Sequence, residues 1–325
     1  MSINKLFYSL IIGLLVNYSA ISFAQDTSNT TVGELEEIVV TAQRREQNIS
    51  DVSQAVQALS GDDLDELNIT NFEEMITLIP GAIQNSTISH GSNVYSIRGV
   101  AASETDGDAT VGYYLDNFAF SIPGRPYAPV TDLYDTERVE VLRGPSGTLY
   151  GLGSLGGTIK VITKDPVIGE FEGAFKATVS EIDDGDSSYT GDLVINAPIS
   201  DNAAIRAVLS IKDIGGWAEI IPSDQTDGNP YEALTGRLKL LVEPNEKTSV
   251  KFTYWRQDSE QEYANRLTYP SPPAIDNVFG ETFSDYTIYI LDVAYDLGFA
   301  MLESTTGYME NTVISNNGGF IPGIG

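Results

Sequence analysis

The chain beyond Gly169 is dominated by segments of about ten residues in which apolar and polar side chains alternate. In the first of them, Phe175, Ala177 and Val179 are separated by polar residues. The same period recurs in six further segments: Tyr189–Ala197, Ala203–Ile211, Tyr231–Val242, Thr248–Arg256, Tyr286–Tyr295 and Met301–Glu310. A two-residue period sends successive side chains to opposite faces of a strand. These segments therefore predict antiparallel β-strands with one apolar face.

Strands of this kind fit either a transmembrane β-barrel or a soluble antiparallel sandwich. The connections separate the two, because 199–202, 243–247 and 296–299 are short whereas 212–230 and 257–285 are long. Short turns at one end and long loops at the other are typical of an outer-membrane barrel. Tyrosines near the strand ends fit an interfacial aromatic girdle. The pattern therefore favours the barrel.

The predicted strands are too few to close a barrel, since the smallest bacterial barrels have about eight strands. The chain stops at Phe320–Gly325 without an evident closing strand. A plugged barrel of 22 strands needs roughly 490 residues beyond Pro166 at the observed spacing. We therefore expect a truncated chain that holds only the first part of a larger barrel.

The N-terminus has the layout of a secretory signal peptide. Lys5 precedes the apolar run Leu6–Val16, and Ser22 and Ala24 supply small side chains before a cleavage site after Ala24. A transmembrane anchor is the alternative, but it needs about 20 apolar residues. We expect residues 1–24 to be removed on export.

Between these regions, residues 48–166 predict a compact α+β domain. A capping box of Ser60 and Asp63 predicts a short helix over 62–67. Apolar residues spaced i, i+3, i+4 and i+7 predict a second helix over 71–79. Strands are expected at Val52–Leu59, Val94–Val100, Val111–Leu115, Arg138–Leu142 and Thr158–Thr163.

Composition excludes several classes of function. The chain has 18 Lys+Arg against 46 Asp+Glu, a net charge of −28 that disfavours nucleic-acid binding. It has no cysteine, which excludes disulfides, thiolate metal sites and cysteine nucleophiles. With His90 as its one histidine, it shows no catalytic constellation and no metal site. We therefore expect neither an enzyme nor a bound cofactor.

A short β-prone run, Glu37–Ala42, stands in polar and flexible surroundings. Such a run is suited to adding itself as a strand to the sheet edge of another protein. Further motifs follow in order along the chain: Ile97–Gly99, Gly112–Asp116, Glu137–Pro145, Gly147–Gly151 and Gly156–Thr163. Together these motifs resemble the N-terminal part of a TonB-dependent outer-membrane receptor, in which the first run is the TonB box. Asn117 and Leu152–Leu155 depart from the common family pattern.

The resemblance implies an α+β plug domain followed by the first seven or so strands of an antiparallel transmembrane β-barrel, which has about 22 strands in the family. The expected parts are a signal peptide at 1–24, a flexible segment with the TonB box at 25–45, the plug at 46–165 and the incomplete barrel at 166–325. The expected location is the outer membrane of a Gram-negative bacterium, with the plug and TonB box on the periplasmic side.

The implied function is active transport of a large nutrient of the siderophore-iron, haem, cobalamin or oligosaccharide class. The implied partners are TonB with its inner-membrane energising complex, the lipid and lipopolysaccharide of the outer membrane, and an extracellular ligand. The resemblance further implies that TonB gates the plug by strand addition to the TonB box.

The resemblance also assigns residues to these partners. TonB is expected to bind Glu37, Ile38, Val39, Val40, Thr41 and Ala42. Contacts of the plug with barrel carboxylates and their neighbours are expected at Arg98, Arg138, Glu140 and Arg143. Apical plug loops are expected to touch the ligand through Ser89, His90, Arg125 and Tyr127.

Other functions are possible on the sequence alone. A surface signalling receptor of the family carries an extra periplasmic domain before the TonB box, where this chain offers only 25–35. A soluble periplasmic binding module follows if the barrel prediction fails. Residues 151–156 match a G-x-G-x-x-G dinucleotide motif, but a strand rather than a helix is predicted after them.

Overall fold

The computed structural model of the protein describes residues 39–41, 44–45, 47–87, 93–102, 107–121, 124–129, 131–151, 153–181, 183, 185–220, 225–262, 274–275 and 282–315. Two compact units divide the chain, Met1–Glu37 and Ile38–Gly325, and all described residues belong to the second. The predicted signal peptide therefore lies outside the described residues. So do Glu37, Ile38 and Ala42 of the predicted TonB box and the apical residues Ser89 and His90.

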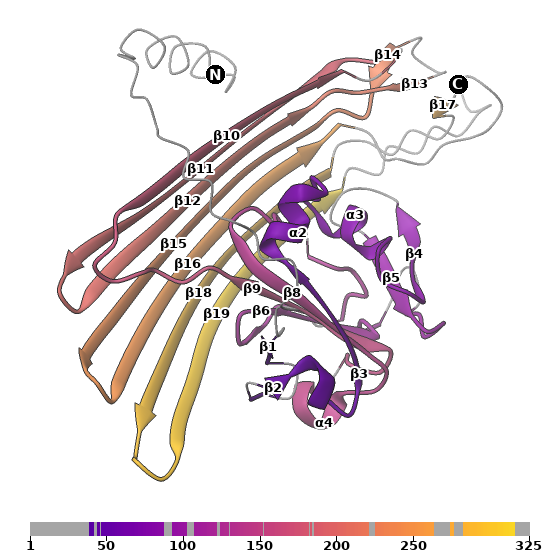
Figure 1. The fold of residues 1–325 in the computed structure, drawn as a ribbon. Coiled ribbons are helices and arrows are strands. Elements are labelled where there is room, and N and C mark those ends of the chain that lie inside the picture. Colours follow the sequence, from indigo (N-terminus) through magenta and orange to yellow (C-terminus); the bar gives the residue numbers. More distant parts are fainter. Residues whose placement is uncertain are drawn as a thin grey trace, which may run out of the picture. The chain divides into compact units, whose positions relative to one another are not determined.

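Seven strands form one antiparallel sheet in chain order, which we call the barrel sheet (Figure 1). They are β10 (Glu172–Glu181), β11 (Ser187–Ser200), β12 (Ala203–Ile214), β15 (Tyr231–Asn245), β16 (Thr248–Gln261), β18 (Thr282–Asp296) and β19 (Met301–Ser315). All seven predicted strands are confirmed. Most are longer than the sequence predicted, because pairing continues past the point where the outward side chains stop being apolar, as at Arg256–Gln261.

The alternation of short and long connections is confirmed. Residues 201–202 link β11 to β12, and 246–247 link β15 to β16. At the opposite end, 215–230 and 262–281 contain three short strands that the sequence did not predict: β13 (Ala218–Ile220), β14 (Gln225–Gly228) and β17 (Ala274–Ile275). These three form a small sheet of their own. We call the two ends of the barrel sheet the short-turn end and the long-loop end.

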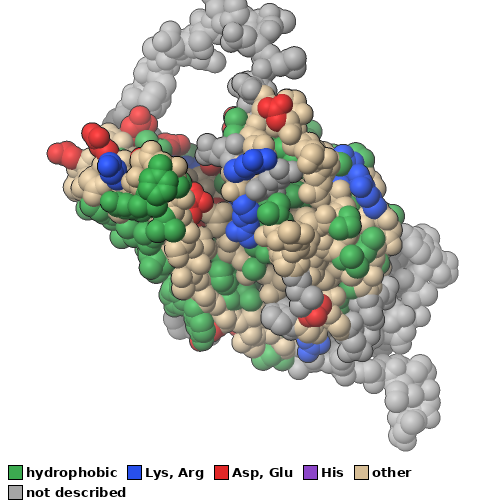
Figure 2. Space-filling model, turned by 90° about the horizontal axis from the view of Figure 1, so that it is seen from below, with side chains coloured by type: hydrophobic (Ala, Val, Ile, Leu, Met, Phe, Trp, Pro, Cys, Tyr) green, Lys and Arg blue, Asp and Glu red, His purple; other side chains and the backbone are tan. Residues whose placement is uncertain are grey.

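One face of the barrel sheet presents large apolar side chains to its surroundings. Leu238, Tyr254, Tyr289 and Tyr308 lie opposite one another in a row across four strands, and three of them are exposed. Hydrophobic side chains gather in the same way along the left side of the molecule seen from below (Figure 2). A soluble sandwich would bury such a face, whereas lipid favours it. The barrel prediction therefore stands over the sandwich.

The other face, here called the lumenal face, is covered by a second domain, the plug. Its central sheet has the order β3 (Ala55–Ser60), β8 (Thr136–Arg143), β9 (Gly157–Thr163), β6 (Val111–Leu115) and β7 (Phe118–Ala119). Only the β6–β9 pairing is parallel. A hairpin of β4 (Ala82–Thr87) and β5 (Asn93–Ile97) stands beside it. The predicted plug strands are present; β4 and β7 were missed.

The plug helices begin where the sequence predicts. Ser60 and Asp63 form the capping box of α2 (Gly61–Glu66), and Asn71 caps α3 (Phe72–Ile76). The second helix is shorter than the predicted 71–79, since the chain tightens into three-residue turns after Ile76. A further turn of helix, α4 (Gly147–Tyr150), was not predicted. Among the residues that the structure describes, no helix is long and apolar enough to cross a membrane.

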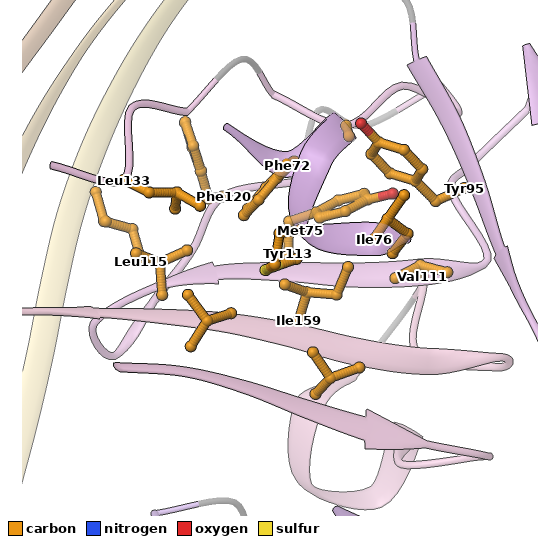
Figure 3. Close-up of a cluster of buried hydrophobic side chains, with 14 of the residues drawn as sticks. Phe72, Met75, Ile76, Tyr95, Val111, Tyr113, Leu115, Phe120, Leu133 and Ile159 are labelled. Atoms are coloured by element: carbon orange, nitrogen blue, oxygen red, sulfur yellow. The ribbon is translucent and has the colours of Figure 1, made fainter. Parts of the chain in front are cut away.

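The core of the plug lies between α3 and the central sheet (Figure 3). Phe72, Met75 and Ile76 reach down from the helix onto side chains of the sheet. Those side chains are Val111, Tyr113, Leu115 and Ile159. All are nearly or fully buried. The predicted apolar stripe of the second helix is thus the layer that holds the plug together.

The plug and the barrel sheet are in tight contact at Gly307 of β19. A Cβ added there would clash with the ring of Phe118. We expect Gly307→Ala in the full-length receptor to weaken plug docking by roughly 1–3 kcal/mol through overpacking. The urea midpoint for plug release, followed with a spin label on an Asp62→Cys variant, measures the effect. Adding Phe118→Ala to the Gly307→Ala chain should restore the urea midpoint. If the midpoint of Gly307→Ala is the same with and without Phe118→Ala, the contact is contradicted.

Candidate functional site

The described part of the predicted TonB box is a short strand on the plug. Strand β1 (Val39–Val40) pairs antiparallel with β2 (Gln47–Asn48). Val40 is 0% exposed and packs in a cluster with Tyr114, Leu142 and Tyr150, whereas Val39 is 45% exposed. The strand therefore has one side docked on the plug and one side open.

Thr41 ties the end of this strand to the central sheet. Its backbone N–H donates to Glu140 Oε1 at 2.8 Å, and Lys160 Nζ donates to Thr41 Oγ1 at 2.8 Å. Glu140 on β8 is 0% exposed and Lys160 on β9 is nearly buried. Burial lowers the pKa of Lys160, while Glu140 opposes that change. A displacement of Thr41 would thus disturb charged groups at the centre of the plug.

Arg44 holds the chain just beyond this strand. Its guanidinium carbon lies 5.3 Å from the ring centre of Tyr114 and 4.9 Å from that of Tyr150. Cation–π contacts of this length are attractive. They add a second attachment between the N-terminal segment and the plug.

The residues predicted to join the plug to the barrel find their described partners within the plug. Arg138 Nε donates to Glu140 at 2.8 Å and Arg138 also pairs with Glu137. Arg143 Nη1 donates to a plug carbonyl at 3.3 Å, and the Arg98 backbone N–H donates to another at 2.7 Å. Contact of these residues with barrel carboxylates stays a prediction.

The ion pairs observed between the two domains are the reverse of the predicted ones. The plug supplies the carboxylates and the barrel sheet supplies the cations. The pairs are Asp65–Lys176 at 3.7 Å, Asp132–Lys212 at 3.0 Å, Asp135–Arg206 at 2.5 Å, Asp135–Arg237 at 2.8 Å, Asp116–Lys239 at 3.1 Å, Asp165–Lys239 at 2.7 Å and Asp165–Lys251 at 2.8 Å. Sequence reasoning missed this network. The sequence feature that could have revealed the network is the set of basic residues at polar, lumen-facing positions of the alternating strands.

Asp135 is the centre of this network. Both of its carboxylate oxygens accept from Arg206, and one accepts from Arg237 as well. All three side chains are almost completely buried. Charge-assisted bonds to a two-pronged guanidinium are strong and directional. The plug is therefore fixed to two strands, β12 and β15, through one carboxylate.

Asp116 shows what the barrel cations do to a buried plug carboxylate. Burial raises its pKa, but Lys239, Lys251 and the N–H of Thr163 outweigh this effect and bring the pKa down to about 2. An ordinary aspartate has a value of 3.8. The carboxylate is therefore charged in the docked plug at pH values well above 2.

We expect this shift to appear as a pH dependence of plug docking. Because the pKa is lower in the folded state, the stabilisation is complete above pH 3.8 and is lost as the pH falls toward about 2. The shift corresponds to about 2 kcal/mol. Urea midpoints for plug release from pH 6 to pH 2 measure it. Asp116→Asn should lower the midpoint at pH 6 and flatten the acid limb; an unchanged acid limb would contradict the assignment.

The predicted ligand residues Arg125 and Tyr127 lie in a loop of the plug that joins other loops. The N–H of Gly124 donates to Asp108 at 2.8 Å, and the N–H of Ala128 donates to the carbonyl of Asn93 at 2.8 Å. Three segments distant in sequence therefore meet here. Arg125 is exposed and Tyr127 is half-buried. Their contact with a ligand stays a prediction.

A cavity of about 830 Å³ lies between the plug and the lumenal face. The plug lines it with α3 and its neighbours, including Phe72, Tyr95 and Asp132. The barrel sheet lines it with Lys212 and Tyr231 near the long-loop end of β12 and β15. Sequence reasoning did not predict this cavity, since it arises only where the two domains meet.

Comparison with known proteins identifies the family. Residues 48–158 match the family model described as TonB-dependent Receptor Plug Domain. The pesticin receptor of Yersinia enterocolitica is 28% identical over 249 residues, which cover 76% of this chain and 35% of that receptor. The vitamin B12 transporter BtuB of Vibrio vulnificus is 26% identical over 235 residues, covering 71% of this chain and 36% of the transporter. The chain thus spans little more than a third of these relatives.

Solved structures show the same fold. The crystal structure of the ferric yersiniabactin uptake receptor FyuA from Yersinia pestis matches with a TM-score of 0.70 at 18% identity, covering 82% of this chain and 42% of that one. The siderophore receptor PiuA from Acinetobacter baumannii matches with a TM-score of 0.63 at 17% identity, covering 82% and 38%. Residues 48–158 thus form the plug domain of a TonB-dependent receptor, and the antiparallel strands that follow match the fold of outer-membrane receptors of Gram-negative bacteria.

Proposed function

We propose that the full-length protein imports a nutrient across the outer membrane, driven by TonB and its inner-membrane energising complex. The observation that carries the proposal is the strand Val39–Val40, which has an open side and is tied through Thr41 to Glu140 inside the plug. TonB binds Glu37–Ala42 by adding a strand. A pull along that strand then reaches the plug sheet through Thr41.

The coupling needs a contact strong enough to transmit force and weak enough to release. A strand of six residues with net gains of about 1 kcal/mol per hydrogen bond meets both conditions. The ligand binds outside at the apical loops that carry Ser89, His90, Arg125 and Tyr127. The apolar outer face of the barrel sheet contacts lipid, and its long-loop end contacts lipopolysaccharide.

The substrate class is a large nutrient: a siderophore-iron complex, haem, cobalamin or an oligosaccharide. The names of the relatives include receptors or transporters for pesticin, ferripyoverdine and vitamin B12. These names support uptake of a bulky ligand rather than of a small solute.

An uptake panel tests the proposal. Cells that express the full-length receptor in a receptor-deleted strain are given labelled ferric chelates, haem, cobalamin and oligosaccharides, with and without a functional TonB. We expect at least one compound to accumulate only when both receptor and TonB are present. The proposal is overturned if every compound that binds and accumulates does so equally with and without a functional TonB.

A further inference from the structure

Five barrel cations that contact the plug form a continuous row down the lumenal face. Lys212 lies at the cavity, near the long-loop end of β12. Toward the short-turn end, Arg237 of β15 is paired with Val208 of β12. Lys239 of β15 comes next and is paired with Arg206 of β12. Lys251 is opposite Leu241, closest to the short-turn end. We call Lys212, Arg237, Arg206, Lys239 and Lys251 the cation ladder.

The cation ladder is a feature of this one face. At the same levels the outer face carries apolar side chains such as Ile205, Leu238 and Phe252. The chain as a whole is strongly acidic, with 18 basic against 46 acidic residues. The lumenal carboxylates Asp192 and Asp292 lie to either side, on β11 and β18.

Every rung of the ladder is neutralised by the plug. The side chains of the five cations are only 1% to 18% exposed, and each contacts a carboxylate of Asp116, Asp132, Asp135 or Asp165. Arg206 and Lys239 carry like charges at directly opposed positions, which is unfavourable without a counter-charge. Withdrawal of the plug would therefore take these carboxylates away from Lys212, Arg237, Lys239 and Lys251, while Arg206 would keep Glu172 of β10 at 2.9 Å.

We propose that the cation ladder is one wall of the path that opens beside the plug, and that it selects ligands bearing carboxylate, phosphate or other anionic oxygen groups. The inference rests on the proposed function. The cavity admits the ligand at Lys212. As the plug carboxylates leave, anionic groups of the ligand replace them rung by rung, so that no buried cation is left unpaired. A neutral ligand cannot make this exchange.

The test measures ion selectivity of the full-length receptor in planar bilayers, with a KCl gradient as the probe and moderate urea to displace the plug. The triple variant R206Q/R237Q/K239Q removes three rungs. R256Q removes a basic residue of the outer face and serves as the matched control. R206K/R237K/K239R keeps the charges and changes the shapes. Heat-modifiable migration on gels confirms that each barrel is folded.

We expect the chloride-to-potassium permeability ratio of the triple glutamine variant to fall roughly twofold or more below that of the wild type. R256Q and the charge-retaining variant should match the wild type. Conductance with an unchanged ratio in the triple glutamine variant would overturn the ladder and leave the proposed function standing. Absence of urea-induced conductance from every protein would mean that no path opens along the ladder without TonB and would overturn the ladder as its wall, while the uptake panel alone decides the proposed function.

Discussion

Val39→Pro in the full-length receptor should abolish uptake of the compound identified by the uptake panel. Proline removes a backbone N–H and fixes φ, so it cannot take part in strand pairing at this position. Val39 lies on the open side of the strand and is not part of the core, so folding and ligand binding should survive. The rate of accumulation should drop to that of cells without TonB.

Val39→Thr is the matched control for this change, since it keeps the N–H and the β-branched shape. We expect its uptake to stay within about threefold of the wild type, in line with the small net value of one side chain in a strand. Normal import by Val39→Pro cells at normal receptor levels would contradict the proposal. Equal loss of ligand binding in both variants would instead place Val39 in the ligand site.

Asp135→Asn should release the plug far more readily than any other single change in the ion-pair network. Asparagine keeps the size of the side chain and tolerates the positive φ of 56° at this position. It removes the charge that Arg206 and Arg237 share, both of which are buried, and leaves Arg206 with Glu172. Loss of one partner of a buried pair costs roughly 3–5 kcal/mol. The urea midpoint for plug release in the full-length receptor should fall accordingly.

Asp65→Asn is the control, because Asp65 pairs with Lys176 at the long distance of 3.7 Å and the Asp65 side chain is 59% exposed. Exposed pairs contribute about 0–1 kcal/mol, so its midpoint should barely move. Midpoints that fall equally in the two variants would show that burial of the Asp135 network does not matter. A cycle that combines Asp135→Asn with Arg237→Gln should recover part of the loss.

The sequence was sufficient for every element whose pattern is local. Alternation located all seven barrel strands, and the capping box of Ser60 and Asp63 located α2 to within a residue or two. It failed for β4, whose run Ala82–Thr87 has no apolar period, and for the strands inside the long loops. Such strands form because a neighbouring segment pairs with them, which no local pattern reports.

The contacts between plug and barrel could not be predicted from local sequence patterns for the same reason. Asp135 reaches Arg206 and Arg237 from about 70 and 100 positions away along the chain. The sequence interpretation placed the contact at Arg138, Arg143 and Glu140, whose described partners lie inside the plug. It could have noted that basic residues at lumenal positions of β12, β15 and β16 require counter-charges, because a buried cation is paired.

Hydrogen exchange of the Val39–Thr41 amides tests the central claim, that TonB takes hold of this segment by adding a strand. The measurement compares the full-length receptor with and without the purified periplasmic domain of TonB. The two-residue pairing of β1 with β2 opens easily, so exchange at Val39 and Val40 should be fast without the partner, whereas the Thr41 N–H is already bonded to Glu140. We predict that exchange of the Val39–Val40 segment slows at least roughly tenfold in the complex, since the segment then lies in a longer ladder. Detectable binding of TonB with unchanged exchange at Val39–Val40 would contradict the account.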